Sequence, residues 1–399
     1  MSGDGLMIGG VDAEALAETY GTPLYVYDEA TIRARYTALR DAITYGRTDI
    51  CYSCKANGNP EIIALFRKLG AAGVDAVSFG EVRLALAAGF TPPQVSLTNP
   101  SLSSEDMQRL QAAGVRLKVD SLSQLRRWRS VGAGEVWLRI NPGRGFGHHA
   151  HVVTAGPRSK FGIYLNDLDE AKAAAGRVAG LHLHAGCGAL EARTFLDAAE
   201  PLFRVAPRFP DLTGLNLGGG LGVPYRPGEA PLDVSELGAG LTERFERMRE
   251  AYGGELTLVL EPGRYLVAES GYLLTRVNAV KRSSERQFVI VDTGFNHLIR
   301  PILYDAYHEV VNASCPQGEP ERVWVGGNVC ESGDLLTDER SIPRPREGDL
   351  LALLDVGAYG YSMASHYTGA ALPAEVLVSD DSHRLIRPRK ELSWEHDGL

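Results

Sequence analysis

One lysine stands where it could do covalent chemistry. Lys55 closes an apolar run that ends in Tyr52-Ser53-Cys54. An amine desolvated among apolar neighbours has a lowered pKa and can form a Schiff base with a carbonyl compound. A lysine can equally mark nothing more than the end of a strand. The segment by itself therefore leaves a catalytic and a structural interpretation open.

Two further segments carry groups suited to an anionic cofactor. In Glu261-Pro262-Gly263-Arg264, a carboxylate and a guanidinium follow an apolar run, and the planar fork of Arg264 suits a phosphate. The run Gly218-Gly219-Gly220 could offer backbone N–H groups to phosphate oxygens. A surface turn with an ion pair would explain the first segment. Glycine turns are common, so the second is weak evidence alone.

The elements that must position these residues follow one pattern. Between about residues 49 and 265, short β-branched or aliphatic runs alternate with helical stretches such as Glu61–Leu69 and Gly80–Ala88. Such alternation indicates parallel strands, and eight repeats favour a (β/α)8 TIM barrel within an α/β fold. The expected strands are Ile50–Lys55, Gly73–Ser78, Gln94–Thr98, Arg116–Val119, Val136–Asn141, Gly180–His184, Gly214–Leu217 and Leu256–Glu261.

The candidate residues fall at the carboxyl ends of these runs. Lys55 follows the first run, His184 ends the sixth, Gly218–Gly220 follow the seventh and Glu261–Arg264 follow the eighth. Barrel enzymes build their active sites at that end of the strands. The agreement between chemistry and position is the strongest argument for the barrel.

After about residue 266 the pattern changes to strands bounded by Gly and Pro, which predicts a second, mostly β domain resembling a sandwich or small barrel. We expect the barrel over residues 29–265 and the second domain over residues 1–28 plus 266–399. Pro23–Tyr27 is strand-like and is expected to add an edge to the second domain. Its other predicted strands are Gln287–Val291, Arg322–Val325, Asp349–Leu354 and Glu375–Val378.

Composition narrows the class of protein. The net charge of -9 over 399 residues gives nucleic acid no basic surface to bind. No apolar run approaches the roughly 18 residues of a membrane span. Five cysteines without a signal peptide fit reduced thiols and a cytoplasmic location. We expect no metal, because Cys51 and Cys54 have no partner pair and the histidine-rich loop 143–151 has no adjacent carboxylate or cysteine.

The segment Tyr52–Asn57 and the following Asp75–Glu81 resemble the alanine-racemase-fold (fold type III) decarboxylases, which use pyridoxal 5'-phosphate (PLP). The resemblance implies that Lys55 binds the cofactor and that His184 stacks on its ring. It also implies that the glycine loop holds the phosphate and that the Glu-Pro-Gly-Arg motif serves the ring nitrogen and the phosphate. The cofactor residues so implied are Lys55, Asp75, His184, Gly218, Gly219, Gly220, Glu261, Gly263 and Arg264.

The carboxyl-terminal half is similar to the diaminopimelate decarboxylase family. The block Asp292–Tyr304 resembles it throughout, which implies that Arg300 and Tyr304 hold a substrate carboxylate. Cys330-Glu331-Ser332-Gly333-Asp334 matches a motif that one subunit inserts into the other's site. Cys330 would then donate a proton and Glu331 would bind the distal ammonium. Tyr359 would reach the cofactor phosphate, and the enzyme would be a homodimer with shared active sites and a small amino-acid substrate.

One departure keeps alternatives open. The family commonly reads Tyr-Asn-x-Arg where this chain has Tyr367-Thr368-Gly369-Ala370. The reaction is therefore expected to be decarboxylation of meso-diaminopimelate to lysine, or else of ornithine, lysine, arginine, carboxynorspermidine or a carrier-bound amino acid. A racemase on the same fold needs two opposed bases, which Cys330-Glu331 suits less well. A binding protein without activity is disfavoured because the chemical residues are all present.

Overall fold

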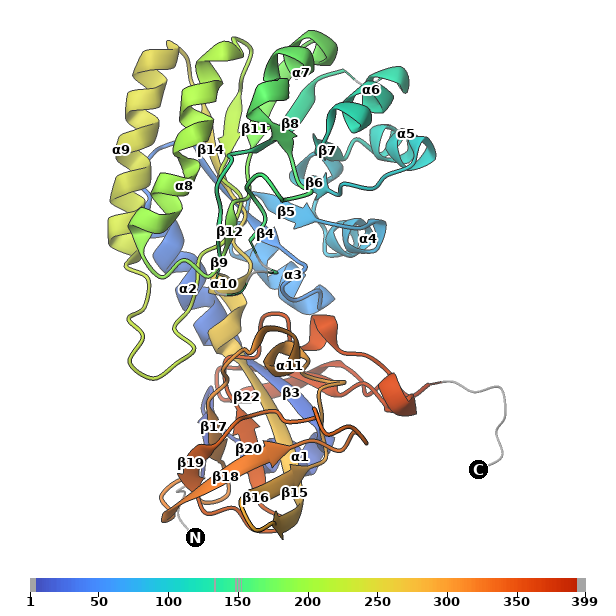
Figure 1. The fold of residues 1–399 in the computed structure, drawn as a ribbon, viewed down its shortest axis with the longest axis vertical. Helices are drawn as coiled ribbons and strands as arrows, with labels where there is room; N and C mark the ends of the chain where they lie inside the picture. The colour runs from blue at the N-terminus through green and yellow to red at the C-terminus, as the bar shows by residue number, and fades with distance from the viewer. Residues whose placement is uncertain (1–4, 133, 148, 150, 152, 393–399) are drawn as a thin grey trace. The chain divides into compact units, whose positions relative to one another are not determined.

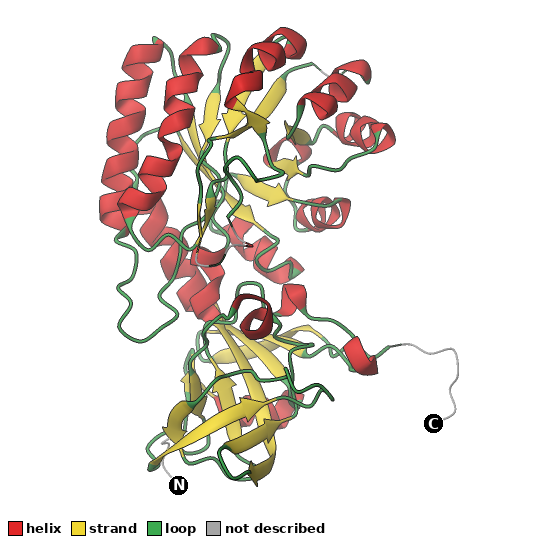
Figure 2. Ribbon diagram, viewed as in Figure 1, coloured by secondary structure: helices red, strands yellow, loops and turns green. Residues whose placement is uncertain are grey.

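The computed structural model describes residues 5–132, 134–147, 149, 151 and 153–392. The chain divides into two units. The barrel unit comprises residues 35–224 and 230–266, and the β unit comprises residues 1–34, 225–229 and 267–399. In Figure 2 strands enclosed by helices form the first unit, whereas strands dominate the second. The domain limits expected from the sequence remain predictions.

The barrel unit contains a closed ring of eight parallel strands. The order is β8-β11-β13-β14-β4-β5-β6-β7, and β7 pairs back onto β8 to close the ring. Each of the eight predicted strands is present, so the predicted barrel is confirmed. The strands are β4 (Thr48–Ser53), β5 (Gly73–Ala76), β6 (Val95–Thr98), β7 (Arg116–Val119), β8 (Val136–Asn141), β11 (Val178–His182), β13 (Gly214–Asn216) and β14 (Thr257–Leu260).

Short parallel pairs lie beside this ring. β10 (Ile163–Tyr164) pairs with β8, and β9 (Phe146–Gly147) pairs with β12 (Gly186–Cys187). The strand β8 is buried along its whole length, as expected for a parallel strand covered on both faces.

Helices follow the strands in sequence and flank them (Figure 1). Local signals set their ends: Asn59 caps α3 by accepting from the Glu61 backbone N–H, and Pro60 occupies its first turn. Across the described part of the chain, no helix has the length and apolar character needed to cross a membrane. The helices are α2 (Glu29–Ala42), α3 (Pro60–Lys68), α4 (Phe79–Ala87), α5 (Ser104–Ala113), α6 (Leu122–Ser130), α7 (Leu168–Ala175), α8 (Ala192–Val205), α9 (Val234–Tyr252) and α10 (Arg264–Val267).

The β unit is built on a mixed sheet. Its main path runs β19-β18-β16-β15-β3-β21-β22, and β20 joins β15 to β17. Ile8, Leu16, Leu274 and Val376 are among the fully buried residues of its core. The elements are β1 (Met7–Ile8), β2 (Val11–Asp12), α1 (Ala13–Tyr20), β3 (Leu24–Asp28), β15 (Gly271–Arg282), β16 (Gln287–Val291), α11 (Arg300–Tyr304), β17 (Val310–Asn312), β18 (Pro320–Gly326), β19 (Arg340–Pro343), β20 (Leu350–Leu353), β21 (Ala374–Ser379) and β22 (Ser382–Arg387).

The predicted position of the amino-terminal strand was wrong. The strand β3 lies inside the sheet, antiparallel to β15 on one side and parallel to β21 on the other. Its first four residues are buried, which is the pattern of an interior strand rather than an edge.

Trp137 packs against two glycines on neighbouring barrel strands. Gly180 pairs directly with Trp137 across β11 and β8, and Gly214 pairs with Gly180. A Cβ atom added at Gly180 would lie 2.2 Å from the indole ring, and one at Gly214 would lie 3.0 Å from it. The glycines therefore provide the space that the indole occupies.

We predict that Gly180→Ala destabilises the protein by about 1–3 kcal/mol, because the new methyl overpacks the indole. Chemical denaturation of the purified variant measures this. Gly46→Ala is the matched control, since a Cβ there meets nothing within 4 Å. Equal stability of the two variants would show that the barrel accommodates the added methyl.

Candidate active site

Strand register brings polar side chains together at the carboxyl end of the barrel. Ser53 pairs with Asp75, Thr98 pairs with Lys118, and His182 pairs with both Arg139 and Asn216. Parallel strands end at the same edge, so these side chains form one layer at the end where barrel enzymes place their chemistry.

Lys55 lies just beyond β4 and faces Asp75. Its Nζ is 3.4 Å from Asp75 Oδ2, which also accepts a hydrogen bond of 2.9 Å from Ser53 Oγ. The Lys55 side chain keeps 33% of its surface exposed, whereas Asp75 keeps 2%. An amine thus lies at the accessible edge of a buried charged layer.

A second lysine, which the sequence analysis missed, lies at the centre of this layer. Lys118 on β7 donates to Asp75 Oδ1 at 2.8 Å and to Thr98 Oγ1 at 3.1 Å, and it also contacts Glu261 Oε1. Asn216 Nδ2 donates to the same Glu261 oxygen at 2.6 Å. Two buried carboxylates therefore share one buried ammonium.

The ion pairs outweigh the cost of burying these charges. Burial alone would raise the pKa of Asp75, but the Lys118 and Lys55 ammonium groups hold that pKa well below its usual range. Burial and the Asp75 charge oppose ionisation of Glu261, yet Lys118 and His182 lower the Glu261 pKa. The Lys118 pKa is raised, because its two carboxylates overcome desolvation. Both acids and the lysine are charged near neutral pH.

Two histidines also lie in this region. Burial lowers the pKa of His182 to about 4, although its Nε2 is 3.3 Å from Glu261 Oε2. His184, predicted to end the sixth strand, instead lies beyond β11, whose last residue is His182. Burial also lowers the pKa of His184, and its Nδ1 accepts from the Gly219 backbone N–H at 3.2 Å. Both rings are neutral near pH 7.

The glycine loop requires residues without side chains. Gly218 and Gly220 have φ of 67° and 117°. A Cβ on Gly219 would lie 2.2 Å from the Glu261 carbonyl oxygen, so the backbones approach closely there. The Gly218 N–H donates to Asn216 Oδ1 at 2.8 Å, which ties the loop to the residue that also binds Glu261.

The Glu-Pro-Gly-Arg turn packs against the loop that carries Lys55. The Ser53 N–H donates to the Pro262 carbonyl at 3.0 Å, and a Cβ on Gly263 would lie 3.0 Å from both Ala56 Cβ and the Ser53 carbonyl. Glycine at this position therefore lets the turn and the Lys55 loop meet. Arg264 is buried, with its Nε 3.2 Å from Cys187 Sγ.

The remaining predicted residues belong to the β unit. Arg300 is buried, lies 4.6 Å from the Tyr225 ring centroid and contacts His308 Nε2 at 2.7 Å. His308 Nδ1 is 2.8 Å from the Leu354 carbonyl and must donate to it, so Nε2 accepts from Arg300. Tyr304, at the end of α11, is half-buried. The Arg300 guanidinium is thus held rigidly by protein groups.

The Cys-Glu-Ser-Gly-Asp turn presents its first two side chains to solvent. Cys330 and Glu331 are exposed, and the Tyr367 hydroxyl donates to Glu331. Asp334 anchors the turn by accepting from the backbone N–H groups of Phe295 and Val329 at 2.7 and 2.8 Å. Tyr359 is half-buried with a positive φ of 59°.

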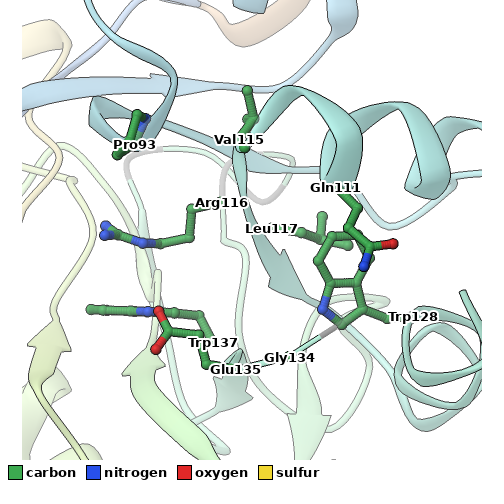
Figure 3. Close-up of a pocket in the computed structure, with 10 residues that line it drawn as sticks. Pro93, Gln111, Val115, Arg116, Leu117, Trp128, Gly134, Glu135 and Trp137 are labelled. Atoms are coloured by element: carbon green, nitrogen blue, oxygen red, sulfur yellow. The ribbon is translucent and has the colours of Figure 1, made fainter. Parts of the chain in front are cut away.

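Other candidates do not form a site. Burial raises the thiol pKa of both Cys51 and Cys54, which disfavours redox or metal chemistry there. In the histidine-rich loop, 148 and 150 lie outside the described residues. No group of histidines, cysteines and acids among the described residues could hold a metal ion. A pocket around Arg116 and Trp137 lies at the opposite, amino-terminal end of β7 and β8 (Figure 3).

The barrel layer suits pyridoxal phosphate. An accessible amine, a buried ionised carboxylate and a glycine loop are the donor set that this cofactor requires for its aldehyde, ring nitrogen and phosphate. Lys118 and His182, two of the residues missed by sequence reasoning, had one available signal. Parallel barrel strands covered on both faces are almost continuously apolar, so a basic residue within one is unusual.

Comparisons with known proteins agree with this chemistry. Residues 29–268 match the family described as pyridoxal-dependent decarboxylase, pyridoxal binding domain. The chain is 42% identical to a diaminopimelate decarboxylase of Methanothermobacter thermautotrophicus, covering 97% of this chain and 94% of that protein. It is 37% identical to that of Pseudomonas aeruginosa, over 96% and 93%. A crystal structure of diaminopimelate decarboxylase from Helicobacter pylori complexed with L-lysine has a TM-score of 0.88, 31% identity and coverage of 96% and 97%.

We predict that His182 makes the protein less stable in mild acid. Its folded-state pKa of about 4 lies below the usual 6.5. As the pH falls from 6.5 towards 4, the unfolded chain therefore binds a proton at this ring and the folded chain does not. The resulting contribution to the free energy of unfolding, roughly 3 kcal/mol, is fully present above pH 6.5 and is lost as the pH falls towards 4.

His182→Gln should flatten the free energy of unfolding over that pH range when denaturation is measured without cofactor. His383→Gln, which removes an exposed histidine of β22, is the matched control. An unchanged slope in His182→Gln would show that this ring takes up its proton equally in the folded and unfolded chain, and would contradict the lowered pKa.

Proposed function

Because the chain belongs to the diaminopimelate decarboxylase family of pyridoxal-dependent decarboxylases, we propose that it converts meso-diaminopimelate to L-lysine and carbon dioxide with PLP as cofactor. The observation that carries the proposal is the accessible Lys55 amine beside a buried, ionised carboxylate layer at the carboxyl end of the barrel. This activity would place the protein in amino-acid biosynthesis, and we infer a cytoplasmic location.

The barrel residues would hold and tune the cofactor. When bound, PLP would supply an electron sink for the electron pair released as carbon dioxide leaves the α-carbon of the substrate. Lys55 would be the amine that attaches the cofactor to the protein, and Asp75 beside it can stabilise the positive charge of the free amine. Glu261, ionised and held by Lys118 and Asn216, supplies the negative charge that a protonated ring nitrogen needs. The Gly218–Gly220 loop would bind the phosphate, with Arg264 and Tyr359 assisting.

Substrate recognition would fall to residues of the β unit. We assign Arg300 and Tyr304 to a substrate carboxylate, because the family motif around them matches. The contact with His308 fixes the position of the Arg300 guanidinium, whose planar N–H donors suit a carboxylate. Glu331 would bind the distal ammonium, and Tyr367 holds its carboxylate.

The site would be completed by a second copy of the chain. In this arrangement Cys330 of the partner subunit protonates the α-carbon, and a C2 homodimer contains two equivalent sites. Exposure of Cys330 and Glu331 in the single chain supports the proposal, since both side chains are accessible to a partner.

The substrate itself is tested by carbon dioxide release and product identity. We expect PLP-loaded protein to convert meso-diaminopimelate to lysine, and Lys55→Ala to lose both the activity and the long-wavelength absorbance of the bound cofactor. Lys172→Ala, which removes an exposed lysine of α7, is the control. Retained absorbance in Lys55→Ala would overturn the role of Lys55.

Conversion of ornithine, carboxynorspermidine or a carrier-bound amino acid instead of meso-diaminopimelate would redirect the substrate assignment. The altered segment Thr368–Leu372 would then be the first region to exchange with the family sequence. It follows Tyr367, whose hydroxyl contacts the proposed ammonium-binding Glu331.

A mixing experiment tests the shared site. Lys55→Ala and Cys330→Ala should each be nearly inactive alone. After dissociation and reassociation together at equal amounts, they should recover roughly a quarter of wild-type activity, because half the dimers are mixed and each mixed dimer has one intact site. Mixed dimers without recovered activity would place both residues in the same protomer's site.

A further inference from the structure

The charges around Lys118 are balanced, and Lys118 is one member of that balance. Three cations, Lys55, Lys118 and Arg139, face three anions, Asp75, Glu261 and Asp120. Arg139 and Asp120 form their own pair at 2.8 Å. Removal of Lys118 would thus leave Asp75 and Glu261 with Lys55 alone.

Neighbouring bases cannot replace this cation. His182 and His184 are uncharged near neutral pH because burial lowers their pKa. Lys55 contacts Asp75, and its amine would be consumed by cofactor binding under the proposed function. The nearby Cys51 thiol is neutral, because burial raises its pKa.

The geometry of Lys118 matches the role of a fixed counter-charge. An ammonium group has three N–H donors, and Lys118 has three partners: Asp75 Oδ1, Thr98 Oγ1 and Glu261 Oε1. Its side chain is 1% exposed, so water cannot screen these contacts. The ammonium therefore links the carboxylate beside Lys55 to the carboxylate of the Glu-Pro-Gly-Arg motif.

We propose that Lys118 is a positioning residue that keeps Asp75 and Glu261 ionised together and fixes the Glu261 carboxylate for the cofactor's ring nitrogen. The proposal rests on the proposed function for its last part only. Two buried carboxylates close to one another without a cation share a proton rather than both ionise. A protonated Glu261 would donate a hydrogen bond to the ring nitrogen instead of accepting one, and the ring would lose its positive charge.

The test uses Lys118→Met, which keeps the length of the stem and removes the charge. Infrared difference spectra of the protein without cofactor, recorded at neutral pH, report protonated carboxylic acids by their carbonyl-stretch band. We expect the band in Lys118→Met and not in the wild type. Adding Glu261→Gln to Lys118→Met should remove it, because the remaining Asp75 carboxylate still has the Lys55 ammonium beside it.

Cofactor binding gives a second, independent measurement. Equilibrium dialysis should show that Lys118→Met binds PLP on the order of tenfold more weakly or worse, because a buried ionised partner is lost. The pH dependence of the bound cofactor's absorbance should shift as well. Lys172→Met serves as the control for loss of a lysine without loss of a buried ion pair.

The outcomes separate this proposal from the proposed function. A folded Lys118→Met protein with no protonated-acid band and an unshifted absorbance profile would overturn the role of Lys118, whatever the substrate. Failure of the wild type to decarboxylate amino acids would leave the infrared result intact. If Lys118→Met does not fold, Lys118→Gln, which keeps hydrogen-bond donors without charge, must show the same band.

Discussion

The contact of one buried ammonium with two buried carboxylates is the constraint on which the rest of the barrel depends. Lys118, Asp75 and Glu261 are each almost fully excluded from water. Charges in such surroundings are tolerated only when they are paired and hydrogen-bonded with good geometry. The side chains come from β7, β5 and the end of β14, so the closed ring must hold three separate strands in register to keep them together.

The two ends of the barrel differ in the side chains that they contain. At the carboxyl end, polar side chains face one another and glycine loops let backbones approach. Towards the amino end, Trp137 lies against Gly180 and Gly214, and the Arg116 guanidinium lies 4.8 Å from the indole centroid (Figure 3). Packing at one end gives the rigidity that preorganised charges at the other end require.

Sequence periodicity was sufficient for the barrel because each strand is a short apolar run separated from the next by a helical stretch. Lys55 and Glu261 could also be found, since both follow such runs. Lys118 could not be found in the same way, because it lies within the strand Arg116-Leu117-Lys118-Val119 and not after its end. Only closure of the ring turns that side chain inward, and closure is a property of eight strands together.

The same limit applied to the β unit. Pro23–Tyr27 was recognisable as a strand, but nothing local says which strands will flank it. Its neighbours β15 and β21 lie about 250 and 350 residues further along the chain. The surroundings of Arg300 were equally hidden, because Tyr225 comes from a segment that sequence order places among the barrel elements.

Because β3 lies inside its sheet, it can pair fully only after strands that are synthesised much later. Every strand of the ring has been synthesised once residue 260 has been added, so the barrel can close after these strands leave the ribosome and while synthesis continues. The strand β3, although translated among the first residues, gains β15 only after residue 271 and β21 only after residue 374. During that interval an apolar strand near the nascent amino terminus has both edges unpaired. Two strands that are synthesised late, β15 and β21, thus cover the edges of a strand that is synthesised early.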